Sequence, residues 1–333
     1  MDAGGRAKQA ARAEWHFLAT DISTAQTPSF EGPFMSRQNG GHPLLILAAI
    51  LSLSVLVACD FASQGTGEVA PAVPQQAVDA RPDEAAESAG SPPETAPQRP
   101  VVAETLPYAE VDDELVYGHF VFPADMVDPL PGVIVIHEWW GLNDDVRAMA
   151  DRIAAEGYVV LAVDLFGGRS TRSPADARAI MVSVVENHDL AEQNIRQAYQ
   201  FLVDSGQAPR IGVLGWDFGG GWSLNTAILF PDDLDAAVIY YGQVTNDEER
   251  LARVNVPILG LFAANDRGIP VAHVRRFEQA LENLRKTYEI EIYADVGHAF
   301  ANPTGPNYNA AIAEQAWTRA LEFLNRYLSV AVD

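Results

Sequence analysis

From about residue 106 to the end of the chain, short apolar runs alternate with segments of helical periodicity. The runs at residues 132–137 and 158–163 are rich in β-branched residues and show no polar alternation, which indicates strands buried on both faces of a sheet. Between them, Val146, Met149, Ala150 and Ile153 recur at helical spacing. This part of the chain therefore predicts a strand–helix–strand rhythm.

The same rhythm continues through the rest of the domain. Further strands are predicted at residues 116–122, 211–214, 236–241, 257–262 and 288–293, and helices at 174–185, 190–204, 219–229, 247–252, 271–284 and 308–328. The strand at 116–122 alternates enough that we expect it at an edge of the sheet. Strands that alternate with helices in this way predict an α/β fold with a doubly wound, mostly parallel sheet and helices on both faces.

The hydrophobic pattern is different before residue 106. A continuous apolar run covers residues 44–58, follows a short basic stretch that starts at Met35, and ends at Cys59. The run is too short for a membrane-spanning helix and is typical of a secretory signal. Leu56-Val57-Ala58-Cys59 looks like a bacterial lipobox, in which Cys59 is lipidated and becomes the mature N-terminus. An uncleaved membrane anchor is the alternative.

These changes of pattern divide the chain into four parts. Residues 1–34 are an extension of uncertain status, and residues 35–59 form the lipoprotein-type signal peptide. Residues 60–105 are rich in Ala, Pro and Glu, so we expect a disordered linker that cannot bury enough surface to order itself. Residues 106–330 form the folded domain. This layout predicts a lipoprotein of the bacterial cell envelope, tethered to the membrane through its N-terminus alone, with the domain outside the cytoplasm.

Charge and cysteine content narrow the classes of function. The 333-residue chain has a formal net charge of −23 and no prominent basic patch, which argues against binding to nucleic acid or to an anionic lipid surface. Its single cysteine is Cys59. The folded domain therefore has no thiol, and both disulfides and a cysteine nucleophile are excluded.

One strand-to-helix junction has the spacing of a nucleophile elbow, Gly215-Trp216-Asp217-Phe218-Gly219. In such a turn, the reactive side chain sits at a strained tip, and small residues two positions away on either side give it room. The tip here is Asp217, rather than Ser or Cys. The backbone N–H of Phe218 would point at an oxyanion that develops in the site.

Three other polar side chains follow strands at the carboxyl edge of the sheet, where functional groups gather. Glu138, Asp266 and His298 come after the strands at 133–136, 258–262 and 288–293. The chain order of elbow residue, acid and histidine is that of an α/β-hydrolase triad. Asp266 could instead be only a helix cap and His298 only a turn residue, but their joint order and placement favour the triad. Three other histidines lack this context and are expected to be structural or surface residues: His137, His188 and His273.

The domain resembles the dienelactone hydrolase family over residues 115–328. The resemblance is carried by His137-Glu138-Trp139-Trp140-Gly141-Leu142, Asp164-Leu165-Phe166, Gly215-Trp216-Asp217-Phe218-Gly219-Gly220, Tyr240-Tyr241-Gly242, Asn265-Asp266-Arg267-Gly268-Ile269-Pro270 and Gly297-His298-Ala299-Phe300. It implies a capless α/β-hydrolase that opens esters or lactones with a Cys-His-Asp triad and an assisting glutamate. Carried over residue by residue, it implies that Asp266 is the acid, His298 the base and Glu138 the assisting residue, with oxyanion donors at the N–H groups of Phe218 and Trp139.

The chain departs from the family at two positions. Asp217 replaces the nucleophilic cysteine, and Asn302 replaces the arginine that binds the substrate carboxylate in dienelactone-cleaving members. Dienelactone itself is therefore not the expected substrate. We expect a hydrolase of ester- or lactone-like small molecules, and nothing in the sequence requires a metal or an organic cofactor. A cation held by Glu138, Asp217 and Asp266 fits the spacing less well than a triad does.

Two alternative functions stay open because of Asp217. A carboxylate is already ionised at neutral pH and could attack an alkyl carbon, as in hydrolases of halides and epoxides. Against this, residues 242–256 are too few for the cap domain of those enzymes, and Phe218 replaces their halide-binding tryptophan. At an ester carbonyl, the adduct of Asp217 would expel carboxylate in preference to alkoxide. Asp217 could instead hold a water for His298 to activate directly. The second alternative is a catalytically impaired binding protein.

Overall fold

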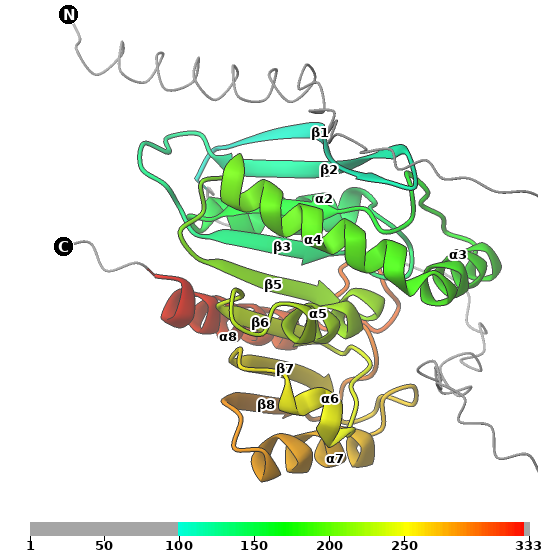
Figure 1. The fold of residues 1–333 in the computed structure, drawn as a ribbon. Helices are drawn as coiled ribbons and strands as arrows, with labels where there is room; N and C mark the ends of the chain where they lie inside the picture. The colour runs from blue at the N-terminus through cyan, green and yellow to red at the C-terminus, as the bar shows by residue number, and fades with distance from the viewer. Residues whose placement is uncertain (1–98, 330–333) are drawn as a thin grey trace, which may run out of the picture.

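The computed structural model describes residues 99–329 of the chain (Figure 1). The predicted signal peptide with Cys59, the extension at 1–34 and residues 60–98 of the predicted linker lie outside the described residues. Within residues 99–329, no helix is both long and apolar enough to cross a membrane.

In this described part, one sheet has the strand order β1-β2-β4-β3-β5-β6-β7-β8. The strands are β1 (Val101–Val111), β2 (Glu114–Pro123), β3 (Gly132–Ile136), β4 (Val159–Val163), β5 (Ile211–Trp216), β6 (Ala236–Tyr240), β7 (Ile258–Ala263) and β8 (Tyr288–Tyr293). β2 runs antiparallel to both β1 and β4, and all the other neighbouring pairs are parallel. The predicted doubly wound, mostly parallel sheet is confirmed.

Helices cover both faces of the sheet (Figure 1). The core on one face includes residues of α2 (Asp144–Ala155) and α8 (Ala310–Leu328). The core on the other face includes residues of five helices: α3 (Pro174–Glu186), α4 (His188–Asp204), α5 (Phe218–Leu229), α6 (Glu248–Ala252) and α7 (Val271–Asn283). Alternate residues of β3 point into the two cores. Val133 and Val135 belong to the core with α2 and α8, and Ile134 and Ile136 belong to the core on the other face. Burial on both faces explains why the β3 sequence shows no polar alternation.

Two local features lie beside the site, a capped helix and a short connection that confirms the predicted lack of a cap domain. Helix α2 begins after Asn143, whose side-chain oxygen accepts a hydrogen bond from the Val146 N–H at 3.0 Å. Between β6 and β7, the chain forms only the five-residue α6 and connecting loops. The carboxyl edge of the sheet therefore carries no cap domain at that junction.

Strand β1 is not among the strands that the sequence predicts, and the predicted edge position of β2 is wrong. β1 begins at Val101, inside the predicted linker of residues 60–105, and it lies outside β2, which is therefore not the edge strand that the sequence predicts. β1 pairs with β2 along its whole length across the turn at Asp112 and Asp113, which both have positive φ. A register shift after Pro107 interrupts its alternation, so β1 depends on its hairpin partner more than on its own pattern.

Candidate active site

The backbone at Asp217 has the strained geometry that the elbow motif predicts. Its φ of 53° and ψ of −113° lie in a region that few residues with a side chain adopt, between the end of β5 and the start of α5. A Cβ atom on Gly215 would lie 2.2 Å from the carbonyl oxygen of Gly219, and one on Gly219 would lie 2.2 Å from that of Ile136. Only glycine fits at both positions, which confirms the elbow.

The histidine ring of His298 lies between two carboxylates. Its Nε2 is 3.0 Å from Oδ1 of Asp217, whose side chain makes no capping bond to α5. Its Nδ1 is 2.8 Å from Oδ2 of Asp266. The other oxygen of Asp266 accepts the backbone N–H groups of Gly268 and Ile269 at 2.8 and 2.9 Å. Asp266 therefore both caps a turn and orients the imidazole, so the two readings of the sequence are compatible.

These contacts determine the protonation of His298. Ionised carboxylate oxygens only accept hydrogen bonds, so both ring nitrogens must donate, and the ring is an imidazolium. Burial alone would lower the pKa of His298, but hydrogen bonds from the ring to Asp217 and Asp266, together with their negative charges, raise that pKa well above its usual value. Burial likewise opposes the ionisation of Asp266, yet the His298 contact lowers the pKa of Asp266. The resting site therefore holds a proton on the imidazole at neutral pH.

Glu138 supplies the third carboxyl group of the site. Its side chain is buried, and it accepts hydrogen bonds from the Tyr241 hydroxyl at 3.3 Å and from the Asn302 amide nitrogen at 2.6 Å. Burial and the negative charge of Asp217 raise the pKa of Glu138 to about 7, although His298, Asn302 and Tyr241 limit the rise. Glu138 is therefore the group of the site that exchanges a proton near neutral pH.

The two hydrogen-bond partners of Glu138, Tyr241 and Asn302, are not predicted by the sequence. Asn302 has a fixed amide orientation because its oxygen accepts hydrogen bonds from the backbone N–H and the hydroxyl of Thr304, at 3.0 and 3.1 Å. Tyr241 follows β6, which lies next to β5 in the sheet, so its proximity to the elbow could have been inferred from strand order. Burial, followed by the charge of Glu138, raises the pKa of Tyr241 well above its usual value, so its hydroxyl remains a donor.

The two backbone groups predicted as oxyanion donors lie at the ends of neighbouring strands. Phe218 is the first residue of α5, and an N–H in the first turn of a helix has no partner within that helix. The helix dipole also favours negative charge at this end. Trp139 follows Glu138 just beyond β3, which pairs with β5. The close approach of Gly219 to the Ile136 carbonyl oxygen shows that the β3 exit packs directly against the elbow.

The alternative of a metal site gains no support from the side-chain arrangement. Among residues 99–329, no group of three or more His, Cys, Asp or Glu side chains is placed to hold a metal ion. The carboxylates of Asp217 and Asp266 instead contact the two nitrogens of one imidazole. Of the four side chains predicted from the sequence, Asp217 and Asp266 contact His298, and Glu138 lies close enough to Asp217 and His298 for their charges to act on it.

Comparison with known proteins agrees with this geometry. The dienelactone hydrolase family model matches residues 117–328. The chain is 32% identical over 208 residues to "Protein usf" of Aquifex pyrophilus, covering 60% of this chain and 89% of that one. It is 31% identical over 219 residues to "Putative carboxymethylenebutenolidase" of Escherichia coli (strain K12), covering 62% and 80%.

Among solved structures, the chain is similar to one titled "Putative Dienelactone Hydrolase" from Klebsiella pneumoniae subsp. pneumoniae MGH 78578. The TM-score is 0.63 at 26% identity, and the match covers 68% of this chain and all of that one. The strand order, the elbow and the family match therefore all indicate the same family. The chain belongs to the dienelactone hydrolase family, whose members are hydrolases of small molecules.

Proposed function

We propose that the protein hydrolyses ester- or lactone-like small molecules with the atypical triad Asp217, His298 and Asp266 and with Glu138. The observation that carries the proposal is the imidazole held between the elbow tip and a second acid, at 3.0 and 2.8 Å. This is the relative placement of the three side chains in a hydrolase triad. The similarity to a protein named for butenolide hydrolysis supports an ester or lactone as the substrate class.

In this proposal, Asp217 positions a water molecule and does not itself attack the carbonyl. Glu138 takes a proton from the water as the water oxygen adds to the carbonyl carbon, because its pKa of about 7 makes its carboxylate available at neutral pH. The N–H groups of Phe218 and Trp139 stabilise the oxyanion. Protonated His298 then gives its proton to the leaving alkoxide oxygen as the C–O bond breaks. A proton moves from Glu138 back to His298 and restores the site.

A second candidate reaction starts from the carboxylate at the elbow tip. Asp217 could displace a leaving group from an alkyl carbon, and water could then hydrolyse the resulting ester on Asp217. The position of Asp217 on the elbow favours this route, whereas the short β6–β7 connection provides no cap over the leaving group. A catalytically impaired binding protein is the third possibility, and it predicts no turnover at all.

The test is a turnover assay with isotope analysis. The purified protein is assayed with p-nitrophenyl esters, lactones and haloacids, and active substrates are then hydrolysed for a single turnover in H₂¹⁸O. We expect ester or lactone hydrolysis with ¹⁸O in the acid product and none in the peptide that contains Asp217. Label in the Asp217 carboxyl would establish the nucleophilic route. No turnover with any of these substrates would contradict both enzymatic proposals.

We also propose that the domain is attached to the bacterial cell envelope through lipidated Cys59. The proposal is supported by the apolar run at residues 44–58 that leads directly to Cys59 and by the polar linker that follows it. A tether of this kind would hold the hydrolase at a membrane surface outside the cytoplasm.

A further inference from the structure

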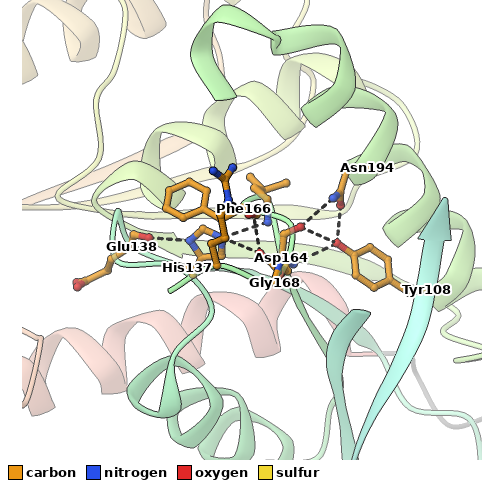
Figure 2. Close-up of polar contacts among 9 residues, drawn as sticks. Tyr108, His137, Glu138, Asp164, Phe166, Gly168 and Asn194 are labelled. Carbon is orange, nitrogen blue, oxygen red and sulfur yellow. Dashed lines mark hydrogen bonds and ion pairs between the residues drawn. The ribbon is translucent and has the colours of Figure 1, made fainter. Parts of the chain in front are cut away.

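The buried histidine that precedes Glu138 has no part in the proposed reaction, and Figure 2 shows its ring between Glu138 and the loop at Asp164. His137 is fully buried, with Nδ1 2.6 Å from the Glu138 carbonyl oxygen and Nε2 3.1 Å from the backbone nitrogen of Leu165. A carbonyl oxygen can only accept a hydrogen bond and an amide N–H can only donate one. The ring is therefore neutral and carries its proton on Nδ1. Burial lowers the pKa of His137, in agreement with the neutral form.

The loop that holds the ring is fastened to two distant elements. Leu165 follows Asp164 at the end of β4, and the Asp164 carboxylate accepts the backbone N–H of Phe166 at 2.8 Å. The Asp164 N–H donates to the Tyr108 hydroxyl of β1 at 3.1 Å, and the Asp164 carbonyl accepts from the Asn194 amide of α4 at 2.9 Å. Tyr108 also donates to Asn194 at 2.5 Å (Figure 2). Tyr108 and Asn194 thus fix the loop that carries the Leu165 N–H, and this N–H in turn fixes the orientation of the His137 ring.

The other nitrogen of the ring holds a peptide group that belongs to the site. The Glu138 carbonyl and the Trp139 N–H are the two ends of one peptide, and this peptide is trans, so the two groups point in opposite directions. The carbonyl accepts from His137 Nδ1–H at 2.6 Å and from the Gly141 N–H at 3.1 Å, and these bonds fix the direction of the Trp139 N–H. A hydrogen bond accepted by the carbonyl also polarises the peptide and strengthens its N–H as a donor. The His137 ring further lies nearly parallel to the ring of Phe218, with centroids 6.1 Å apart.

We propose that His137 is a positioning residue of the hydrolytic site, whose Nδ1–H holds the 138–139 peptide so that the Trp139 N–H faces the developing oxyanion. The inference rests on the proposed function, since Trp139 is an oxyanion donor only in a hydrolase. It assigns a role to a histidine that the sequence classed as structural or surface. Because the same peptide begins at Glu138, a rotation of this group would also displace the carboxyl group that exchanges protons with water.

A matched pair of variants separates the two hydrogen bonds of the ring. His137→Asn places an amide nitrogen near the position of Nδ1 and keeps the donor to Glu138, but it loses the acceptor for Leu165. His137→Gln places an amide oxygen near the position of Nε2 and keeps the acceptor, but it loses the donor. His137→Asn leaves the Leu165 N–H without its acceptor, whereas in His137→Gln the Glu138 carbonyl keeps the bond from the Gly141 N–H at 3.1 Å. The thermal midpoint should therefore fall in both variants, and by no more in His137→Gln than in His137→Asn.

Only the His137→Gln variant should lose catalysis. Removal of one oxyanion donor lowers kcat by about 10²–10³-fold, and here the donor is displaced rather than removed, so we expect a loss of about 10- to 100-fold. We expect KM to be unchanged, because the donor acts on charge that develops only in the transition state. The kcat of His137→Asn should stay within about threefold of the wild-type value, a difference of less than 1 kcal/mol. A purely structural histidine would give equal losses in both variants.

A second measurement does not require turnover. In ¹⁵N-resolved NMR spectra of the full chain, His137→Gln should shift the Trp139 amide resonance and speed its hydrogen exchange, whereas His137→Asn should move the Leu165 amide and leave Trp139 in place. Equal kcat losses in the two variants, or an unmoved Trp139 amide in His137→Gln, would overturn the inference. If the wild-type protein hydrolyses none of the substrates, the proposed function fails, and the Trp139 amide alone decides whether His137 holds the peptide.

Discussion

Replacing Glu138 with glutamine should stabilise the folded protein above neutral pH. The substitution keeps the shape of the side chain and its contact with Asn302. The glutamine oxygen can accept from the Asn302 amide, but its NH₂ group replaces the oxygen that accepts from the Tyr241 hydroxyl. The loss of that acceptor adds a cost that does not vary with pH. What disappears is the ionisable proton. In the wild-type protein, burial and the charge of Asp217 raise the pKa of this carboxyl group from 4.5 to about 7.

The size and sign of the effect follow from this pKa. In the unfolded chain, Glu138 ionises near its ordinary value, whereas in the folded protein it keeps its proton until about pH 7. The wild-type protein therefore loses stability as the pH rises between these two values, and below them it loses nothing. At about 1.36 kcal/mol for each pH unit, the full loss above pH 7 is about 3 kcal/mol. For a domain of this size, it corresponds to roughly 6–12 °C in Tm.

The assay is a series of thermal melts of wild type and Glu138→Gln from pH 4 to pH 9. We expect the Tm of Glu138→Gln minus that of wild type to be lowest at pH 4, to rise between pH 4.5 and 7, and to stay constant above that. Glu282→Gln, a change at an exposed position of α7, is the control and should give a flat difference. A difference for Glu138→Gln that does not vary with pH would refute the assignment of the neutral-range proton to Glu138.

Three other outcomes are expected. His298→Ala and Asp266→Asn should each lower kcat by about 10³-fold or more. The double variant should be little worse, because members of one catalytic unit do not contribute additively. Wild-type-like rates in His298→Ala would contradict the assignment of His298 to the triad. Asp217→Cys should hydrolyse activated esters faster than wild type, because a thiolate is a far better nucleophile at a carbonyl than a carboxylate. The substitution also removes the repulsion between the carboxylates of Asp217 and Glu138. Rates no better than wild type would favour the binding-protein alternative. Mass spectrometry of membrane-extracted protein should find a lipid-modified N-terminal Cys59, and an intact terminus before residue 44 would exclude it.

The parts of the fold that the sequence predicts are those set by local rules. The buried strands β3 to β7 show as continuous apolar runs, and Gly215 and Gly219 mark the elbow because no larger residue fits beside it. The order of Asp217, Asp266 and His298 along the chain, and their positions after strands, were enough to predict that these three side chains lie together. β1 escaped prediction because its pairing with β2, rather than its own pattern, defines it.

The features that escaped prediction depend on contacts between distant segments. The hydrogen bond from Asn302 to Glu138 joins residues on different loops, and no spacing rule predicts it. The charge state of His298 likewise follows from the simultaneous contact of its two nitrogens with Asp217 and Asp266. The sequence placed a base at that position, whereas the distances indicate an acid at rest. Protonation depends on the summed field of the neighbouring groups, which only the assembled site defines.

The elbow has a consequence for how this family can diversify. The shape of the turn is determined by the backbone: by the glycines on either side of the tip and by the hydrogen bond from the Asp217 N–H to the Tyr240 carbonyl at 3.0 Å. None of these constraints involves the side chain at the tip. Evolution can therefore exchange a thiol for a carboxylate at this one position without having to rebuild the surrounding architecture. The same independence makes residue 217 a natural starting point for engineering new reactivity into an otherwise unchanged scaffold.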